Sequence, residues 1–311
     1  MIAPVSASRA APAPCRPTVP FLAVVAGIGV FSAMDAAMKG AALVGGVYTA
    51  LLLRNALGTG FAAAFWLTGK RALPAPATLR LHAFRAAITT AMAALFFYGL
   101  VRVPMAEAIA ISFIAPIVAL FLAALLLGEV IRPQAILASL LGILGVVVIA
   151  AGRMGGLEAS GETIAGIAAI LLSALFYALN LVLQRQQALL ASPREIALFQ
   201  NLFATGFTAL AAPWLFVAPG GDGWAPVALA ALAALLATGA HLLLSWGYAR
   251  AETQVLVTGE YTGFLWAAVL GWLFFDEKVA PATVAGAMLI LGGCWIGARN
   301  KVSAGQAPTI G

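Results

Sequence analysis

The chain has 311 residues, of which 63% are hydrophobic and 9% are charged, and its formal net charge is +6. Soluble proteins carry about 25% charged residues, so this composition excludes a fully solvated surface and indicates an integral membrane protein. No basic cluster is interleaved with aromatic side chains, so the net charge does not indicate nucleic-acid binding.

Residues 1–19 are rich in Pro and Ala and carry two arginines, which is typical of a short disordered cytoplasmic tail. A cleaved signal peptide is the rival interpretation. The following apolar segment contains Asp35 and Lys39 and runs at once into a second span, which favours the tail. Cys15 lies in this tail and Cys294 in the last apolar segment, so neither a disulfide framework nor a metal site is expected, and no cofactor is implied.

Apolar runs of about 20 residues predict an all-α integral membrane fold. Ten spans are expected, near residues 20–41, 47–68, 81–102, 105–127, 134–152, 163–185, 194–217, 226–248, 253–275 and 280–298. They divide into a first repeat of five spans over residues 20–152 and a second over 163–298, followed by a cytoplasmic tail at 299–311.

The two halves share a sequence pattern. Arg102, Glu129 and Pro133 return at a constant offset as Arg250, Glu277 and Pro281. The stretch 54–61 also returns as 200–207, and Asp35 and Lys39 align with Asn180 and Gln184. An odd number of spans per half inverts the second repeat relative to the first, and inverted repeats are a transporter architecture.

Lysine and arginine predict the orientation, because cytoplasmic loops are enriched in them. With the N-terminus inside, only Lys39, Arg102, Arg153 and Lys278 fall outside. The cytoplasmic set is Arg9, Arg16, Lys70, Arg71, Arg80, Arg85, Arg132, Arg185, Arg194, Arg250, Arg299 and Lys301. Both termini are therefore expected in the cytoplasm of a bacterial cell, with the protein in the inner membrane.

The paired endings Ala115-Pro116…Leu127-Gly128-Glu129…Pro133 and Phe275-Asp276-Glu277…Pro281, with Lys39 and Arg54, resemble the drug/metabolite transporter superfamily. Within it the chain is similar to the EamA-type family with two EamA domains, over residues 20 to 299. The resemblance implies transport of a metabolite such as an amino acid, S-adenosylmethionine or riboflavin, through a cavity between the halves. The stretch 98–113 looks like the S-adenosylmethionine-uptake branch. Gln184 departs from the pattern because it lacks the positive charge of Lys39.

Helix depth predicts one polar cluster in each half. Asp35, Arg54, Asn55 and Ser112 fall about a third of the way in from the outer face, with Tyr98 and Lys39 nearer the surface. A buried charge needs a partner, so Arg54 is expected to face Asp35, with Lys39 competing for the same carboxylate. The pair either forms an outer gate or only holds two helices together.

The second cluster is expected at a similar depth from the inner face, and it comprises Asn180, Gln200, Asn201, His241 and Glu260. Glu260 and His241 are candidates for proton coupling, because burial moves the pKa of both groups toward physiological pH. The alternative is that Glu260 caps a weak helix or reaches the cytoplasm.

Both clusters lie beside expected helix breaks. Pro116 has no N–H, so it frees the carbonyl of Ser112, and the aligned stretch 258–263 contains two glycines around Glu260. Such breaks persist in a membrane against protein or a water-lined cavity, so either two ordinary kinks or a solute pathway explains them.

Four aromatic side chains fall near these clusters and are candidates to hold a planar or cationic solute, although interface packing is the alternative. They are Tyr98, Trp246, Tyr261 and Trp266. Small residues at Ala138, Gly142, Gly293 and Gly297 allow close helix approach, either within one subunit or in a homodimer.

Enzymatic sequence patterns are not found. The two histidines, His82 and His241, lie on separate spans, and the chain has no His-Glu-x-x-His, Gly-x-Ser-x-Gly or phosphate-binding glycine loop. Alternating-access transport of a small metabolite across the lipid bilayer, with or without proton coupling, is therefore the expected function. A lipid-handling or structural membrane protein is the alternative.

Overall fold

The computed structural model describes residues 18–69, 73–115, 117–118, 121–122, 133–154, 160–218, 224–248, 250 and 259–299. Most of these residues are helical, and no strand occurs among them. The first half contributes α1 (Thr18–Gly45), α2 (Val47–Leu67), α3 (Pro76–Leu100), α4 (Met105–Ser112) and α6 (Pro133–Met154). The second half contributes α7 (Gly161–Leu190), α8 (Pro193–Leu210), α9 (Ala212–Leu215), α10 (Trp224–Tyr248), α12 (Gly263–Phe275) and α13 (Pro281–Arg299).

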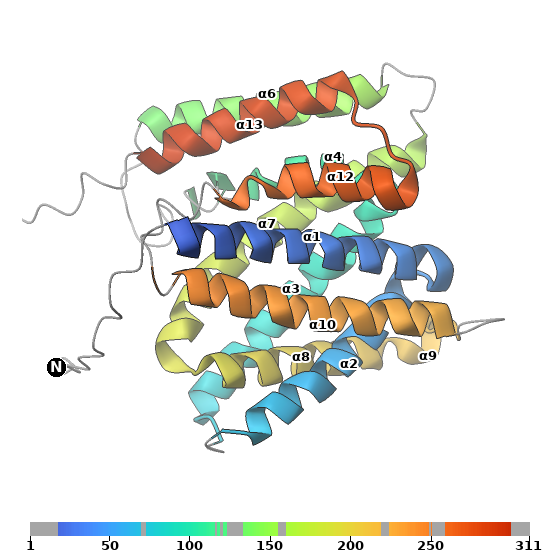
Figure 1. The fold of residues 1–311 in the computed structure, drawn as a ribbon, viewed down its shortest axis with the longest axis vertical. Helices are drawn as coiled ribbons and strands as arrows, with labels where there is room; N and C mark the ends of the chain where they lie inside the picture. Colours follow the sequence, from blue (N-terminus) through green and yellow to red (C-terminus); the bar gives the residue numbers. More distant parts are fainter. Residues whose placement is uncertain are drawn as a thin grey trace, which may run out of the picture.

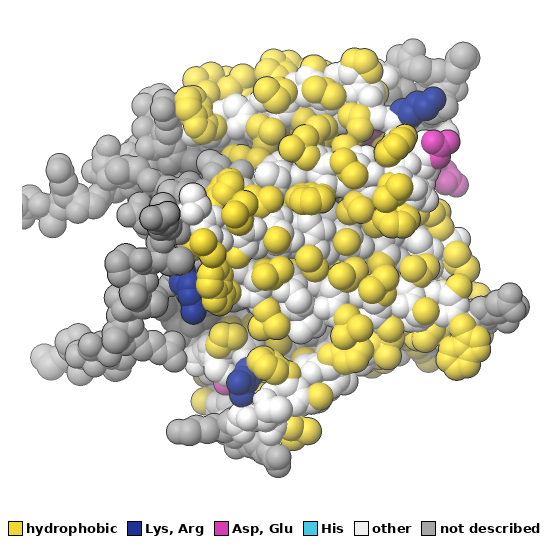
Figure 2. Space-filling view, viewed as in Figure 1, with side chains coloured by type: hydrophobic (Ala, Val, Ile, Leu, Met, Phe, Trp, Pro, Cys, Tyr) yellow, Lys and Arg dark blue, Asp and Glu magenta, His cyan; other side chains and the backbone are white. Residues whose placement is uncertain are grey.

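The outer surface of the helix bundle has the apolar character of a membrane-spanning protein. Five of the described helices are long and apolar enough to span a bilayer: α1, α2, α3, the first part of α7 and most of α10. Shorter apolar helices lie at Ser139–Gly152, Gly263–Phe275 and Pro281–Gly293. Figure 2 shows a face covered by hydrophobic side chains along the helices, with the charged side chains gathered toward the helix ends.

The described helices do not by themselves account for the ten predicted spans. The stretch predicted as one span at 194–217 is divided into α8 and α9, because Pro213 lies where a continuing helix would need its N–H. Much of the predicted span at 105–127, and the start of the one at 253–275, lie outside the described residues.

Corresponding helices of the two halves pack against one another. α2 contacts α8, α4 contacts α12, and α6 contacts α13, while α1 pairs with α10 and α3 with α7. Figure 1 shows α6 and α13 side by side at one edge of the bundle. This pattern is that of a pseudo-twofold axis, which exchanges the α1–α10 pair with the α7–α3 pair.

The contacts of α2 with α8 give the relative direction of the repeats. Tyr48 hydrogen-bonds the carbonyl of Thr208, whereas Arg194, at the other end of α8, reaches Thr68 at the end of α2. The two helices are therefore antiparallel, as an inverted repeat requires. Between these ends the hydroxyls of Thr59 and Thr205 lie 3.0 Å apart, so equivalent residues of the two halves meet.

Glycine allows the close approach of α6 and α13. A Cβ on Gly286 would lie 2.5 Å from the Gly145 carbonyl oxygen and 2.5 Å from a side-chain carbon of Ile149. Gly142 contacts Ile117 of the same chain, so this small residue serves packing within one subunit.

Gly286→Ala is expected to lower the stability of the purified protein by about 1–3 kcal/mol, because a methyl group at this position overpacks the interface. Gly292→Ala on the same helix is the matched control. A Cβ there meets nothing within 4 Å, so helix propensity makes that change neutral or stabilising. Equal thermal unfolding midpoints for the two variants would contradict the packing argument.

Candidate functional site

Lys39 and Glu277 form an ion pair that connects the two halves. The Lys39 Nζ atom lies 2.5 Å from Glu277 Oε1 and donates to the Val103 carbonyl at 2.9 Å. The other carboxylate oxygen accepts from the Met105 amide at 2.8 Å, at the first residue of α4. A negative charge is favourable at a helix N-terminus, so Glu277 also caps α4. Lys39 is 5% exposed, which makes the pair largely buried.

The end of α12 positions Glu277. Asp276 adopts a left-handed conformation (φ 53°), and the Glu277 amide then donates to the Gly271 carbonyl at 3.1 Å. This turn folds Glu277 back over the helix end. A Cβ at residue 271 would lie 2.5 Å from Glu277 Oε2, so only glycine leaves room for the carboxylate.

The predicted competition of Lys39 for Asp35 is replaced by this pairing. Lys39 and Asp35 are one helical turn apart on α1, but the ammonium group of Lys39 points to the other half of the molecule. Helix spacing predicts only neighbours within the same helix. The observed partner of Lys39, Glu277, is more than 200 residues away in the sequence.

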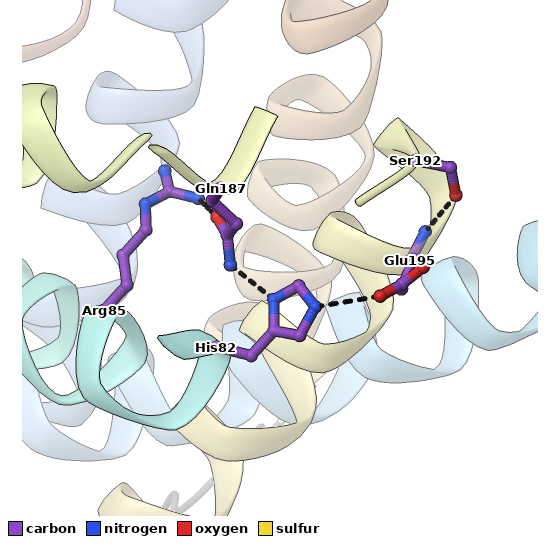
Figure 3. A network of polar contacts seen from close by, with 5 residues as sticks. All are labelled: His82, Arg85, Gln187, Ser192 and Glu195. Atoms are coloured by element: carbon purple, nitrogen blue, oxygen red, sulfur yellow. Dashed lines mark hydrogen bonds and ion pairs between the residues drawn. The ribbon is translucent and has the colours of Figure 1, made fainter. Parts of the chain in front are cut away.

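A second polar group, the Arg85 network, connects α3, α7 and α8 (Figure 3). It lies in the first half of α3, whereas Val103, which accepts from Lys39, follows the end of that helix. Arg85 is buried and its guanidinium donates to Asn180 at 2.8 Å, to Gln187, and to Gln184 at 3.4 Å. Gln187 in turn contacts His82, whose other ring nitrogen lies 3.2 Å from Glu195.

Local sequence signals place the α8 part of the network. Ser192 precedes the helix and its hydroxyl accepts from the Glu195 amide, with Pro193 in the first turn. Glu195 is thereby held where its carboxylate meets His82. Phe199, one turn further, stacks on the His82 ring at 5.4 Å between centroids.

Arg85, which the charge bias predicts on the cytoplasmic side, is buried in this network, and so is His82. The side of the membrane on which Arg85 lies stays a prediction. The helix begins at Pro76, five residues before the predicted span, so Arg85 lies about 14 Å along it. Pro76 at a first helical position was the signal that could have placed the start earlier. Sequence reasoning also missed Gln187 and Glu195, since neither stands out by composition or depth.

Asp35 lies on α1 and Arg54 on the neighbouring helix α2. They are half-buried and not in direct contact: no ion pair or hydrogen bond joins them. Arg54 makes a long hydrogen bond of 3.4 Å to Asn55, and its buried Nε has no hydrogen-bond acceptor. The predicted facing of Arg54 and Asp35 therefore stays a prediction.

His241 is in direct contact with neither Arg54 nor Arg85. Its ring packs edge-on against Phe31 at 4.9 Å between centroids and contacts the Ala237 carbonyl. Its side chain is exposed on the helix.

Polar residues on α2 and α8 meet at the pseudo-twofold axis. Asn55 is buried. Asn201 binds the Ala197 carbonyl and approaches Gly58, where a Cβ would be 2.7 Å from its oxygen. Gln200 donates to Thr89 on α3. These amides connect α2, α3 and α8.

The regular helices break at corresponding places in the two halves. α4 ends at Ser112, whose hydroxyl binds the Ala108 carbonyl, and α12 begins at Gly263 after a turn at residues 259–262. Glu260 is half-buried in that turn and lies within electrostatic range of Tyr177. Pro116 lies outside the described residues, as does Glu129, the counterpart of Glu277.

Two of the four candidate aromatic side chains contact arginines at helix ends. The Arg102 guanidinium lies 3.5 Å from the Tyr98 ring centroid, and Arg250 lies 4.4 Å from that of Trp246. These pairs are equivalent in the repeat.

The other two aromatic side chains pack between helices. Tyr261 packs edge-on against Phe113 at 5.9 Å. Trp266 covers Gly29 of α1, where a Cβ would lie 2.9 Å from the indole.

Two inverted helical repeats with charges buried between them define a class of membrane transport proteins. The chain belongs to the EamA-like transporter family, which matches residues 18–151 and 164–298.

Curated relatives and a solved structure agree with this assignment. The chain is 26% identical over 211 residues to the pseudopaline exporter CntI of two Pseudomonas aeruginosa strains, UCBPP-PA14 and PAO1, covering 66% of this chain and 70% of each relative. A solved crystal structure shares the fold with a TM-score of 0.59 at 22% identity, covering 92% of this chain and 99% of the other. The family and the named exporter indicate membrane transport of small molecules, and the solved structure supports the fold.

Proposed function

We propose that the protein is a secondary transporter that moves a small organic metabolite across the bacterial inner membrane by alternating access. The bias of Lys and Arg supports an orientation with both termini in the cytoplasm. In this orientation the Lys39–Glu277 pair lies toward the periplasm and the Arg85 network toward the cytoplasm.

The observation that carries the proposal is the Lys39–Glu277 pair. It ties α1 of the first half to the end of α12 of the second, and its carboxylate also holds the start of α4. Because the pair is largely buried, separating Lys39 from Glu277 exposes both charges. Another interaction must offset the free energy that this separation costs. Such a contact closes one end of the space between the halves until solute binding or relaxation releases it.

The opposite end is closed by different chemistry. Gln184 occupies the position of Lys39 in the second repeat, and its side chain is uncharged. The Arg85 network joins α3, α7 and α8 through amide side chains and the His82–Glu195 contact. The two ends therefore open at different energetic cost, which favours one resting state of the cycle.

A metabolite is the proposed solute because the chain resembles a protein named as an exporter of pseudopaline. Uphill transport would use an ion gradient, and we assign proton coupling to Glu260 and His241. Glu260 is half-buried at the break before α12, and His241 is exposed on α10. Both are ionisable groups inside the bundle, where such residues mark solute or proton pathways.

The first test is thermal unfolding of the detergent-purified protein with amino acids, nucleosides, S-adenosylmethionine, riboflavin and lipids. Binding to the native state raises the unfolding midpoint by mass action. A soluble metabolite that shifts the midpoint is then assayed for saturable uptake into proteoliposomes. Shifts by lipids alone, with lipid scrambling and no metabolite uptake, would replace this proposal with lipid handling.

An imposed pH gradient is expected to drive accumulation of that metabolite in proteoliposomes containing the native chain. Glu260→Gln removes the proton carrier, so this variant should still equilibrate the metabolite but should not respond to the gradient. Glu162→Gln, at an exposed carboxylate near a helix start, is the control and should behave as the native chain. A gradient-insensitive native protein with a fully active Glu260→Gln variant would remove proton coupling.

A further inference from the structure

One contact at the centre of the α2–α8 crossing joins a residue to its own counterpart in the other repeat. Thr59 and Thr205 hold the same place in the repeated stretches 54–61 and 200–207, and their hydroxyl oxygens lie 3.0 Å apart. A twofold rotation exchanges every residue with its counterpart, so two counterparts can touch only beside the rotation axis. The pseudo-twofold axis therefore passes between α2 and α8 at this pair.

A second pair of counterparts gives another point on the axis. Phe113 and Tyr261 are separated by the same offset as Arg102 and Arg250. Phe113 directly follows α4, and Tyr261 lies in the turn before α12. Their rings pack edge-on with the centroids 5.9 Å apart. The axis therefore runs from the α2–α8 crossing to the place where the two helix breaks meet.

The two ends of the α2–α8 crossing do not share this equivalence. At one end, Arg194 on α8 donates to Thr68, just after α2, at 3.5 Å. The counterparts of these two residues, Tyr48 and Trp214, lie at the opposite end. There Tyr48 donates to the Thr208 carbonyl, and Trp214 is 81% exposed. The crossing is therefore symmetric at its centre and asymmetric at its ends.

The hydrogen bonds of the central threonine pair suit a contact about which two helices turn. Each hydroxyl also donates to a carbonyl one turn earlier in its own helix, Thr59 to Asn55 at 2.9 Å and Thr205 to Asn201 at 2.8 Å. These acceptors move with their own helix, so they stay in reach at any angle between α2 and α8. A rotation about the axis therefore leaves neither hydroxyl without a partner, and the cost of an unmet hydrogen bond is avoided.

We infer, resting on the proposed transport function, that the Thr59–Thr205 contact is the pivot of the transport cycle and persists while α2 and α8 rotate against each other. Alternating access moves one inverted repeat against the other about a fixed centre. When the two repeats exchange their conformations, the Thr59–Thr205 contact maps onto itself. The Arg194–Thr68 contact is instead replaced by the contact of its counterparts. The central contact is therefore common to both end states, whereas the contact at the helix ends belongs to one of them.

The test places a covalent tether at the pivot. Thr59→Cys with Thr205→Cys, in the full chain carrying Cys15→Ser and Cys294→Ser, puts two sulfur atoms where the hydroxyl oxygens lie 3.0 Å apart. The sulfur atoms of a disulfide are about 2 Å apart, so a small adjustment lets the bond form on mild oxidation. Mass spectrometry measures the metabolites that proteoliposomes accumulate from a bacterial metabolite extract, relative to empty vesicles. Accumulation is expected to be the same with the disulfide formed and after its reduction.

The matched control tethers the ends of the same two helices. Thr68→Cys with Arg194→Cys, in the same serine background, is bridged by a bifunctional thiol reagent that reduction cleaves. This bridge fixes a contact that the exchange of the repeats has to replace. It is therefore expected to reduce accumulation to the level of empty vesicles, and cleavage of the bridge should restore accumulation.

Loss of accumulation when the disulfide between residues 59 and 205 forms, with recovery on reduction, overturns the pivot and leaves transport in place. A folded protein in which this disulfide does not form also overturns it, because the two side chains are then not held in contact. Equal accumulation with and without the bridge between residues 68 and 194 contradicts the exchange at the helix ends. No accumulation by the untethered native chain overturns the proposed function itself, and with it this inference.

Discussion

Replacing Glu277 by Gln is expected to lower the free energy of unfolding by about 3–5 kcal/mol, because it removes the carboxylate that lies 2.5 Å from the largely buried Lys39 ammonium. The change also weakens the cap on the α4 N-terminus, where Glu277 accepts from Met105. Thermal or denaturant unfolding in detergent measures the effect.

The neighbouring Lys278 supplies the matched control for this variant. Its side chain is exposed, so Lys278→Gln should change stability by less than about 0.5 kcal/mol. The double variant Lys39→Met with Glu277→Gln should recover part of the loss, since it also removes the buried ammonium charge. If Glu277→Gln alone were as stable as the native chain, the pair would not hold the two halves together.

Gln187→Leu is expected to be destabilising by about 1–3 kcal/mol, because the residue is fully buried and contacts both Arg85 and His82. The substitution removes one acceptor from a buried guanidinium and one partner from the imidazole. Unfolding midpoints measure the loss of stability, and transport of the identified solute measures the functional consequence.

Gln184→Leu, three residues earlier on α7, tests whether burial decides the effect. Gln184 is exposed and its contact with Arg85 is long, at 3.4 Å, so this change should cost less than about 0.5 kcal/mol. Arg85→Lys should resemble Gln187→Leu, since a lysine keeps the charge but cannot reach several acceptors in one plane. Equal losses for the two glutamine variants would contradict the arrangement in Figure 3.

The amino-acid sequence alone determined the architecture of this protein. Long apolar runs require helices, because backbone groups in a bilayer must be satisfied within the segment. The return of Glu129 and Pro133 as Glu277 and Pro281 indicated two repeats, and an odd number of spans per repeat predicted the inversion. The antiparallel contact of α2 with α8 is the structural counterpart of that count.

Only the tertiary structure decided which polar side chains meet. The depth of a residue along its helix does not determine which way its side chain faces or which helix lies beside it. Lys39 therefore pairs with Glu277 of the other half, whereas helix spacing predicted Asp35. Arg85 lies in the interior of the bundle because α3 starts at Pro76. Long-range packing set α1 on α10 and α3 on α7, and helix depth alone does not predict these pairings.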